Sequence, residues 1–240
     1  MNVTEVTEVV HWGRDLAEYR QMFALTDDDL EKRILGCSDG PACFNAEMTA
    51  LGHHVVSFDP LYAMPLARIA ARIREGADFG RALSYARHDD LFSWSSEGYT
   101  SVDGVIDRHA AAMKRFLDDF RQEGEGKRYG EGKRYIAGGL PNLPFDDDSF
   151  DLALCGHYLF LYSHMQSLEY HLDSVHQMLR VAREVRIHPL LDLTPARSPY
   201  VDPLIDTLRA EGHKVNELDL GTYERLSGGT ATLQIIRNRS

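Results

Sequence analysis

The sequence predicts an α/β fold built on a doubly wound sheet, and three observations support this. Residues 34–59 show the pattern of a strand, a glycine-bearing turn, a helix and a second strand that ends on Asp59. Apolar strand patterns recur later, separated by helical patterns, at 150–156, 184–193, 214–220 and 231–236. A short glycine turn separates the last two, which favours an antiparallel final hairpin. We therefore expect seven strands, the third near Tyr135.

Length and charge limit the classes of protein to consider. A chain of 240 residues fits one domain over 1–240 with a core of its own. The formal net charge is −11 and no long basic run occurs, which argues against a nucleic-acid partner. No apolar run reaches the length of a membrane span, and the acidic N-terminus is unlike a secretion signal. We expect a cytoplasmic protein with no membrane partner; the oligomeric state stays open.

Two residue types that often mark metal sites or disulfides carry little signal. The cysteines, Cys37, Cys43 and Cys155, lack metal-like spacing and are too few for a disulfide framework, so we expect them to be buried. His171 and His176 fall on different faces of a helix expected at 168–181. No metal site is predicted.

The chain begins with a predicted helical cover at about 9–32. Apolar residues from Trp12 to Phe23 follow a helical stripe, and Thr26 with three aspartates is typical of the start of a second, short helix. Arg14 and Tyr19 lie on this cover. Both could contact a ligand. Alternatively, Arg14 is a surface residue and Tyr19 a packing residue.

The turn after the first strand is the first candidate site. Small residues alternate there, at Gly36, Ser38, Gly40 and Ala42, which lets the backbone approach a ligand closely. Asp59 ends the next strand, where its carboxylate can accept hydrogen bonds from a ribose diol. This combination indicates a nucleoside-containing cofactor. A dinucleotide is disfavoured because the G-x-G-x-x-G spacing is absent.

A long insertion follows Asp59. About 75 residues separate it from the next strand, with helical patterns at 66–73 and 105–120. Tyr85, Phe92, Trp94 and Tyr99 lie between them in an irregular stretch. We interpret the region at about 62–133 as a helical lid that contributes to a substrate pocket; alternatively, its aromatics only attach the insertion to the body. A tandem Gly-Glu-Gly-Lys-Arg-Tyr duplication at 124–135 is expected to be a surface loop.

The second candidate motif is Leu143-Pro-Phe, an acidic turn and Ser149-Phe-Asp, leading into an apolar strand. That strand ends at Gly156-His157. His157 is the first candidate for a substrate-facing base or orienting group, with Tyr162 second and His164 also considered. The competing interpretation is that His157 hydrogen-bonds the strand end.

With both motifs in this order, the chain resembles the class I S-adenosylmethionine-dependent methyltransferases, in their small-molecule branch and in a bacterial subfamily of unknown substrate. The resemblance covers nearly the whole chain apart from the insertion. It implies a seven-stranded Rossmann-like sheet with an antiparallel last strand and a helical insertion between strands two and three. It also implies S-adenosylmethionine as cofactor, S-adenosylhomocysteine as product, and in-line methyl transfer to a small-molecule acceptor.

The resemblance assigns cofactor contacts to a set of residues from both motifs and the cover. These are Arg14, Tyr19, Gly36, Ser38, Asp39, Gly40, Ala42, Asp59, Pro60, Leu61, Leu140, Leu143, Cys155, Gly156 and His157. The acidic composition and aromatic insertion favour an uncharged or cationic, partly apolar acceptor.

The sequence departs from the family pattern at two places. Gly36 stands where an acid usually orders the loop, and Gly138-Gly139 where an acid usually receives the adenine amino group. Asp39 is a candidate to replace the first, and no residue is an evident replacement for the second. The alternative is therefore a catalytically impaired protein of this fold that acts as a binding or assembly module. A nicotinamide-dependent reductase is the third hypothesis.

Overall fold

A seven-stranded sheet in the order β3-β2-β1-β4-β5-β7-β6 forms the centre of the computed structural model, which describes residues 9–86, 101–123, 132–220 and 231–238. Strand β7 pairs antiparallel with both β5 and β6, and the other pairings are parallel. The strands are β1 (Ile34–Cys37), β2 (Val55–Asp59), β3 (Tyr135–Ala137), β4 (Phe150–Gly156), β5 (Ala182–His188), β6 (Lys214–Asp219) and β7 (Ala231–Ile236). This confirms the predicted α/β class, the seven strands and the antiparallel final hairpin.

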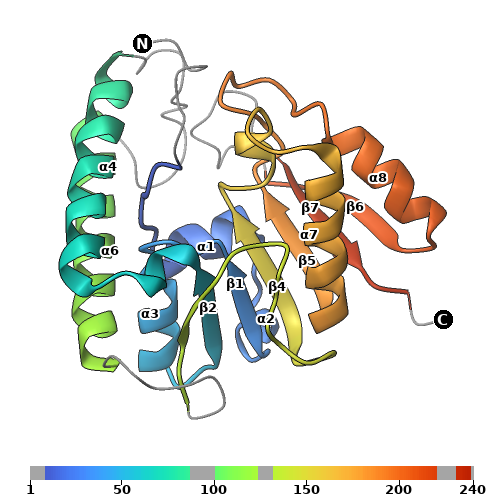
Figure 1. Cartoon of the computed structure of the whole chain (residues 1–240), viewed down its shortest axis with the longest axis horizontal. Helices are drawn as coiled ribbons and strands as arrows, with labels where there is room; N and C mark the ends of the chain where they lie inside the picture. Colours follow the sequence, from blue (N-terminus) through green and yellow to red (C-terminus); the bar gives the residue numbers. More distant parts are fainter. Residues whose placement is uncertain (1–8, 87–100, 124–131, 221–230, 239–240) are drawn as a thin grey trace.

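The helices cover both faces and one edge of the sheet (Figure 1). They are α1 (Leu16–Met22), α2 (Asp27–Leu30), α3 (Phe44–Ala50), α4 (Leu66–Ala86), α6 (Val102–Glu123), α7 (Leu168–Val181) and α8 (Val201–Ala210), with 3-10 turns η2 (Pro60–Ala63) and η3 (Phe160–Tyr162). The two helices of the insertion pack on each other beside α3 and β2. Both are longer than the sequence pattern predicts.

Two apolar clusters fill the space between the sheet and its helices. Alternate residues of the central strands point to opposite faces, as the two-residue period of a strand requires. Leu35 and Ala153 pack toward α7 and α8, whereas Ile34 and Leu152 pack toward α1, α2 and α3. Because both faces are buried, the central strands are apolar throughout, as expected for parallel sheets.

A third cluster attaches the insertion to the sheet edge. Phe116 of α6 is fully buried against Tyr62 of η2 and Tyr135 of β3, with ring centroids 5.9 and 5.5 Å away. Among the aromatics that the sequence placed in the insertion, Phe92, Trp94 and Tyr99 lie outside the described residues, as does the side chain of Tyr85. The first copy of the duplicated segment lies outside them as well.

The N-terminal cover differs from its prediction. Residues 9–15 form an extended segment, and helices begin only at Leu16 and Asp27. Asp15 caps α1 and Thr26 caps α2, each in a reciprocal capping box with the acid three residues later. The helical stripe seen in the sequence therefore holds for α1 but not for Trp12, which precedes the cap.

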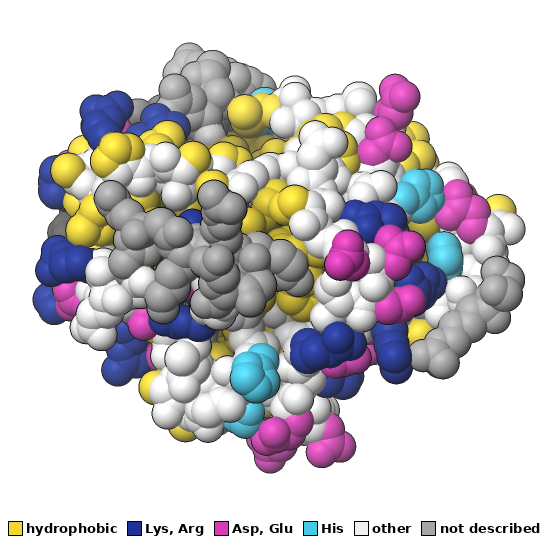
Figure 2. Space-filling view, turned by 60° about the horizontal axis from the view of Figure 1, so that its bottom comes forward, with side chains coloured by type: hydrophobic (Ala, Val, Ile, Leu, Met, Phe, Trp, Pro, Cys, Tyr) yellow, Lys and Arg dark blue, Asp and Glu magenta, His cyan; other side chains and the backbone are white. Residues whose placement is uncertain are grey.

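On the outer surface, acidic and basic side chains lie next to one another over much of the face in Figure 2. In the described part of the chain, no helix is both long and apolar enough to cross a bilayer.

Candidate functional site

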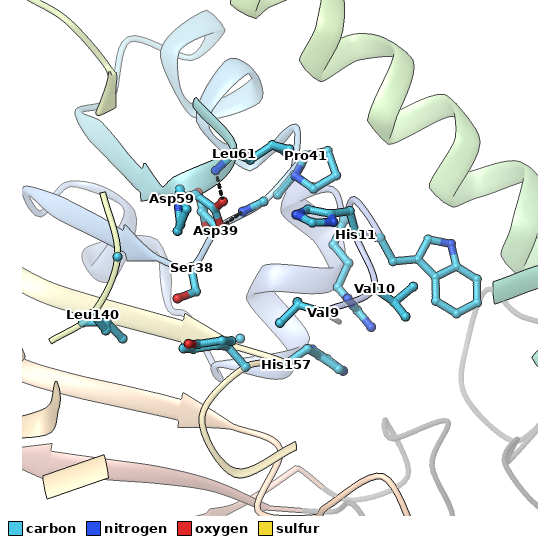
Figure 3. Close-up of a pocket in the computed structure, with 18 of the residues that line it drawn as sticks. Val9, Val10, His11, Ser38, Asp39, Pro41, Asp59, Leu61, Leu140 and His157 are labelled. Carbon is cyan, nitrogen blue, oxygen red and sulfur yellow. Dashed lines mark hydrogen bonds between the residues drawn. The ribbon is translucent and has the colours of Figure 1, made fainter. Parts of the chain in front are cut away.

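A cavity of about 480 Å³ opens at the carboxyl ends of β1, β2 and β4 (Figure 3). The connections after β1 and β4 leave toward opposite ends of the sheet, so this edge is the switch point where ligands bind in open α/β sheets. The volume is in the range of small-molecule sites. The wall is supplied by residues 9–14, α1, the β1–α3 loop, the end of β2 with α4, residues 139–140, the end of β4, and α7.

Hydrogen bonds hold the β1–α3 loop against β2. Ser38 and Gly40 both have left-handed backbone conformations, with φ of 54° and 53°. The Ser38 N–H donates to the carbonyl of Phe58 at 2.8 Å, and the Tyr62 hydroxyl donates to the Gly40 carbonyl at 2.6 Å. The small residues noted in the sequence thus let the loop turn tightly beneath the cavity.

Asp59 joins this loop to the end of β2. One carboxylate oxygen accepts from the Gly40 N–H at 2.9 Å and the other from the Leu61 N–H at 2.7 Å. Burial raises the pKa of Asp59 to about 6, although the two backbone N–H groups act in the opposite direction. Each carboxylate oxygen has a second lone pair. Asp59 lines the cavity and can therefore accept hydrogen bonds from a ligand as well.

Asp39 is the second acid of the cavity wall. Its carboxylate accepts from the hydroxyls of Tyr19 and Ser57, each at 2.5 Å. A Cβ built at Gly36 would lie 2.5 Å from all three carboxyl atoms of Asp39, so Asp39 occupies the volume that a side chain at Gly36 would need. Burial raises the pKa of Asp39 from its ordinary value, against the effect of the two hydroxyl donors.

Arg14 brings a positive charge to the same cavity. Its side chain is 12 % exposed, and Glu18 lies 4.0 Å from its Nε in a loose ion pair. Among the described residues, the buried Nε has no hydrogen-bond partner. The positive charge of Arg14 acts to lower the pKa of both Tyr19 and Tyr162, against the larger effect of burial. A guanidinium buried with so few partners is costly unless an anion binds to it.

The extended segment 9–14 is fixed at both ends. The Tyr162 hydroxyl accepts from the Val10 N–H at 3.0 Å. Beyond the segment, Arg108 of α6 binds both carboxylate oxygens of Asp15, at 2.6 and 2.8 Å, and His109 lies 2.9 Å from the buried Glu18. The segment thus forms one wall of the cavity.

The opposite wall comes from the end of β4. His157 has a left-handed backbone conformation, φ 53°, and its N–H donates to the His188 carbonyl at 2.6 Å. The Tyr170 hydroxyl donates to the Leu140 carbonyl at 2.9 Å and lies 2.8 Å from the Tyr158 hydroxyl. Figure 3 shows His157 and Leu140 facing Asp59 and Ser38 across the cavity.

Most of the residues predicted from the sequence meet at this cavity. Those that line it are Arg14, Tyr19, Ser38, Asp39, Gly40, Ala42, Asp59, Pro60, Leu61, Leu140, Gly156 and His157. What the sequence could not indicate is that Arg14 reaches it from an extended segment.

Four predicted residues lie elsewhere. Gly36 is beneath Asp39, and Cys155 and Leu143 belong to the apolar cluster on the α7 side of the sheet. Tyr162 is buried and holds Val10, so the structure places it as a structural contact of the N-terminal segment. All three cysteines are buried, as expected.

Several wall residues were missed by the sequence analysis. They are Val9, Val10, His11, Trp12, Met22, Pro41, Met64, Arg72, Gly139, Tyr158 and Tyr170. The sequence held only a weak sign of these contacts, namely two glycines. Gly13 is where the N-terminal segment meets Pro41, and Gly76 is where α4 meets the backbone of His11. Within the described ranges, no group of three or more His, Cys, Asp or Glu side chains could hold a metal ion.

Comparison with known proteins adds one sequence relative. No protein-family model matches the chain. The uncharacterized protein MJ0045 of Methanocaldococcus jannaschii is 28% identical over 237 residues, which span 99% of this chain and 100% of that protein.

Solved structures of SAM-dependent methyltransferases are similar at a low level. The TehB-like methyltransferase of Corynebacterium glutamicum matches over 99% of this chain and 93% of its own, with TM-score 0.47 and 11% identity. The Burkholderia thailandensis 1,6-didemethyltoxoflavin-N1-methyltransferase, solved with S-adenosylhomocysteine, matches over 94% and 80%, with TM-score 0.48 and 14% identity. The match to WbdD, with TM-score 0.45 and 13% identity, spans 93% of this chain but only 40% of that one. At these scores the likeness assigns neither ligand nor activity.

Proposed function

We propose that this protein binds S-adenosylmethionine and transfers its methyl group to a small-molecule acceptor. One observation carries the proposal: a single cavity presents a carboxylate suited to ribose, Asp59, and a buried guanidinium suited to an amino-acid carboxylate, Arg14. A ligand that joins a nucleoside to an amino acid matches both. S-adenosylmethionine and S-adenosylhomocysteine are such ligands.

At the nucleoside end, Asp59 would accept hydrogen bonds from the ribose hydroxyls. Its position is fixed before the ligand arrives, because the Gly40 and Leu61 N–H groups already hold both oxygens. Leu61 is only 2 % exposed and contributes an apolar surface beside the acid. Preorganised acceptors of this kind reduce the ordering cost of binding.

At the amino-acid end, Arg14 would bind the α-carboxylate and Asp39 would face the α-ammonium group. The Tyr19 hydroxyl donates to Asp39, and the charge of Arg14 acts to lower the pKa of the same hydroxyl. A positive and a negative group in one cavity are complementary to a zwitterion. Asp39 thereby takes the part that the usual acid at position 36 would have.

When bound, S-adenosylmethionine supplies a methyl group on a sulfonium, whose leaving group is already activated. The chain then has to align the acceptor with the methyl group and exclude water. Residues 9–14 and α4 enclose the cavity on the side away from the sheet, which fits that role. His157, at the end of β4, is placed to orient the acceptor or to accept its proton where the nucleophile is a hydroxyl.

Calorimetric titration with S-adenosylmethionine and with S-adenosylhomocysteine tests the proposal. We expect micromolar binding of both to the wild-type protein and at least a tenfold loss in Asp59→Ala and in Arg14→Gln, since each removes a charge-assisted hydrogen bond of about 1.5–3 kcal/mol. Asp206→Asn and Arg74→Gln alter exposed residues of the same types and should bind like the wild type. No binding of either compound at millimolar concentration would refute the proposal, as would preferred binding of a nicotinamide nucleotide.

A second candidate is a protein that binds the cofactor without turnover, and one observation favours it. A Cβ at Gly138 would lie 2.5 Å from ring atoms of Phe58, so the adenine-binding acid of the family cannot be placed there. Release of S-adenosylhomocysteine from bound S-adenosylmethionine, on adding a small-molecule cell extract, separates the two. Release supports the enzyme; tight binding with no release in any extract supports the binding protein.

A further inference from the structure

Two tyrosine hydroxyls meet at the end of the cavity where Leu140 lies. Tyr158 follows β4 and Tyr170 belongs to α7, and both side chains line the cavity. Their oxygens are 2.8 Å apart, and the Tyr170 oxygen is 2.9 Å from the Leu140 carbonyl oxygen. Burial raises the pKa of both hydroxyls, so both keep their proton at neutral pH. Each hydroxyl therefore has one proton to donate and two lone pairs that accept.

The directions of these hydrogen bonds follow from the carbonyl group. A carbonyl oxygen can only accept, so the Tyr170 hydroxyl donates to Leu140. Its one proton is then used, and the Tyr158 hydroxyl must donate to Tyr170. A hydrogen bond from the Gln166 side chain acts to lower the pKa of Tyr158, against the larger effect of burial, which is the action of a donor. The donors thus run in one direction, from Gln166 through Tyr158 and Tyr170 to Leu140.

One hydrogen-bonding position in this series is left for a ligand. Tyr158 donates its proton to Tyr170 and accepts from Gln166, and no donor from the described residues reaches its second lone pair. The direction cannot reverse, because the Leu140 carbonyl at the far end has no proton to give. Tyr158 therefore presents an acceptor to the cavity, and the ligand group beside it is expected to carry an N–H or O–H.

The turn after β3 places this acceptor near Asp59. The Gly138 N–H donates to the Asp59 carbonyl at 3.3 Å, and a Cβ at Gly139 would lie 3.2 Å from the Cγ of Pro60. The turn that carries the bonded carbonyl thus runs alongside the end of β2. The charge of Asp59 also contributes to the raised pKa of Tyr158, as expected for groups on the same side of the cavity.

The proposed orientation of the cofactor brings its base to this end. In that orientation Asp59 holds the ribose and Arg14 holds the α-carboxylate, so the base lies on the side of Asp59 away from Arg14. Figure 3 shows Leu140 on the opposite side of the cavity from Val10, which belongs to the same N-terminal segment as Arg14. The end of the cavity with the two tyrosines is therefore the end that faces the base.

We propose that the Tyr158 hydroxyl accepts a hydrogen bond from the exocyclic amino group of adenine and so selects the base of the cofactor. This deepens the proposed function, on which it rests, by naming the residue that recognises the base. A Cβ at Gly138 would lie 2.5 Å from ring atoms of Phe58, so an acid cannot take this role there. Tyr170 is a positioning residue, because it takes the proton of Tyr158 and keeps that hydroxyl an acceptor.

The test compares two ligands that differ at the 6-position of the base. S-adenosylhomocysteine carries an amino group there, whereas S-inosylhomocysteine carries a carbonyl oxygen, which would face the Tyr158 lone pair. The measurement is the ratio of their dissociation constants by calorimetry. We expect the wild type to bind S-adenosylhomocysteine about tenfold or more tighter, because the site rejects a base without the donor. In Tyr158→Phe the two ligands should bind within about threefold of each other.

Tyr170→Phe is the sharper variant, because it leaves the Tyr158 oxygen in place. The Tyr158 hydroxyl then loses its acceptor and can turn its proton toward a ligand carbonyl, so S-inosylhomocysteine should gain and the ratio should fall at least about threefold. A merely structural role of Tyr170 would weaken both ligands equally. Tyr200→Phe removes the hydroxyl of a tyrosine outside the cavity wall and should keep the wild-type ratio.

Equal binding of the two ligands to the wild type would overturn the proposal, as would a preference for adenine that survives in Tyr158→Phe or is unchanged in Tyr170→Phe. In the first of these cases S-adenosylhomocysteine still binds, so the proposed function stands while base selection by Tyr158 fails.

Free adenosine and inosine separate the two proposals in the other direction. If S-adenosylhomocysteine and S-adenosylmethionine fail to bind, but adenosine binds more tightly than inosine and Tyr158→Phe removes the difference, the proposed function fails and base selection stands. Failure of both nucleosides and both cofactor forms to bind would overturn both proposals.

Discussion

At the scale of single residues, Gly36 and Asp39 form a pair in which one supplies the space that the other fills. Gly36 has no side chain, and the Asp39 carboxyl group fills the volume above it. Tyr19 from α1 and Ser57 from β2 fix that carboxyl group, and Asn45 of α3 donates to the Ser57 hydroxyl at 3.0 Å. The loop acid Asp39 is thus held in place above Gly36 by neighbours from α1, α3 and β2.

This pairing predicts strong coupling in a double-mutant cycle. Gly36→Ala should destabilise the protein by about 1–3 kcal/mol through overpacking against Asp39. In an Asp39→Ala background the same change should cost at least about 1 kcal/mol less, because the clashing group is gone. Urea unfolding followed by circular dichroism measures both. Gly104→Ala, at an exposed position of α6 where only the Ser101 hydroxyl lies near, is the control and should not destabilise the protein, since alanine is favoured over glycine in a helix by up to about 1 kcal/mol. Additive effects at 36 and 39 would contradict the pairing.

Asp59 is expected to make cofactor binding depend on pH. Burial raises its pKa from 3.8 to about 6, and the ionised form is the better acceptor for ribose hydroxyls. Affinity for S-adenosylhomocysteine should therefore be constant above pH 7 and weaken below pH 6, approaching tenfold per pH unit. Asp59→Asn should bind weakly with no such dependence. Calorimetry between pH 5 and 7.5 measures this, and a flat wild-type profile would exclude the role of Asp59.

The raised pKa of Asp59 makes the stability of the ligand-free protein depend on pH in the opposite direction. Between about pH 4 and 6 the folded state holds more protons on Asp59 than the unfolded chain does. The contribution of this group to stability is therefore greatest at low pH and is lost as the pH rises through 6. Ligand binding and stability are thus expected to trend in opposite directions over this range.

At the scale of elements, one buried arginine joins the N-terminal cover to the sheet. Arg186 of β5 donates to the carbonyl of Phe23 at 2.8 Å and to that of Ala24 at 3.2 Å, and it binds both oxygens of Asp29 at 3.1 and 3.2 Å. Burial raises the pKa of Asp29, but the hydrogen bond from Lys32 and the other contacts, Arg186 among them, act more strongly and lower it to about 2. The ion pair holds α1 and α2 in the position from which Arg14 and Tyr19 reach the cavity.

Breaking this ion pair should be costly. Arg186→Met leaves two carbonyls without this donor and leaves the buried Asp29 with Lys32 and the Thr26 N–H alone, so we expect a loss of about 3–5 kcal/mol in urea unfolding. Arg20→Met, which removes an exposed partner of Asp27, is the matched control and should cost under about 1 kcal/mol. The contribution of Asp29 should be present above pH 4 and be lost as the pH falls toward 2. Equal costs for the two variants would contradict this account.

At the scale of the whole molecule, the cavity depends on the sheet order. The β1–α3 loop and the end of β2 are close in sequence, but residues 9–14, 139–140, 156–158 and Arg72 are distant from them. The order β3-β2-β1-β4 brings these segments to one edge, and the insertion encloses that edge from the side of α4 (Figure 1). The two charges proposed to recognise the cofactor thus come from different elements, Arg14 from the segment before α1 and Asp59 from the end of β2.

The sequence by itself determined the class of fold and many of the residues at the sheet edge where the cavity lies. Alternating small residues, a strand ending on Asp59 and the apolar runs of β4 and β5 are local patterns with a fixed period, so they predicted strands, turns and the position of Asp59. The same locality explains the error at 9–15, where apolar spacing resembled a helix although the chain is extended and held by Tyr162 and Arg108.

Only the tertiary structure decided which charges face the cavity. Arg72 and His11 carry no local signal, because their positions depend on Gly76 allowing two distant segments into backbone contact. The fit between Gly36 and Asp39 likewise became visible only in the structure, where the Asp39 carboxyl group fills the space above Gly36. Local patterns determine elements, whereas the electrostatic character of a site depends on which elements the packing brings together.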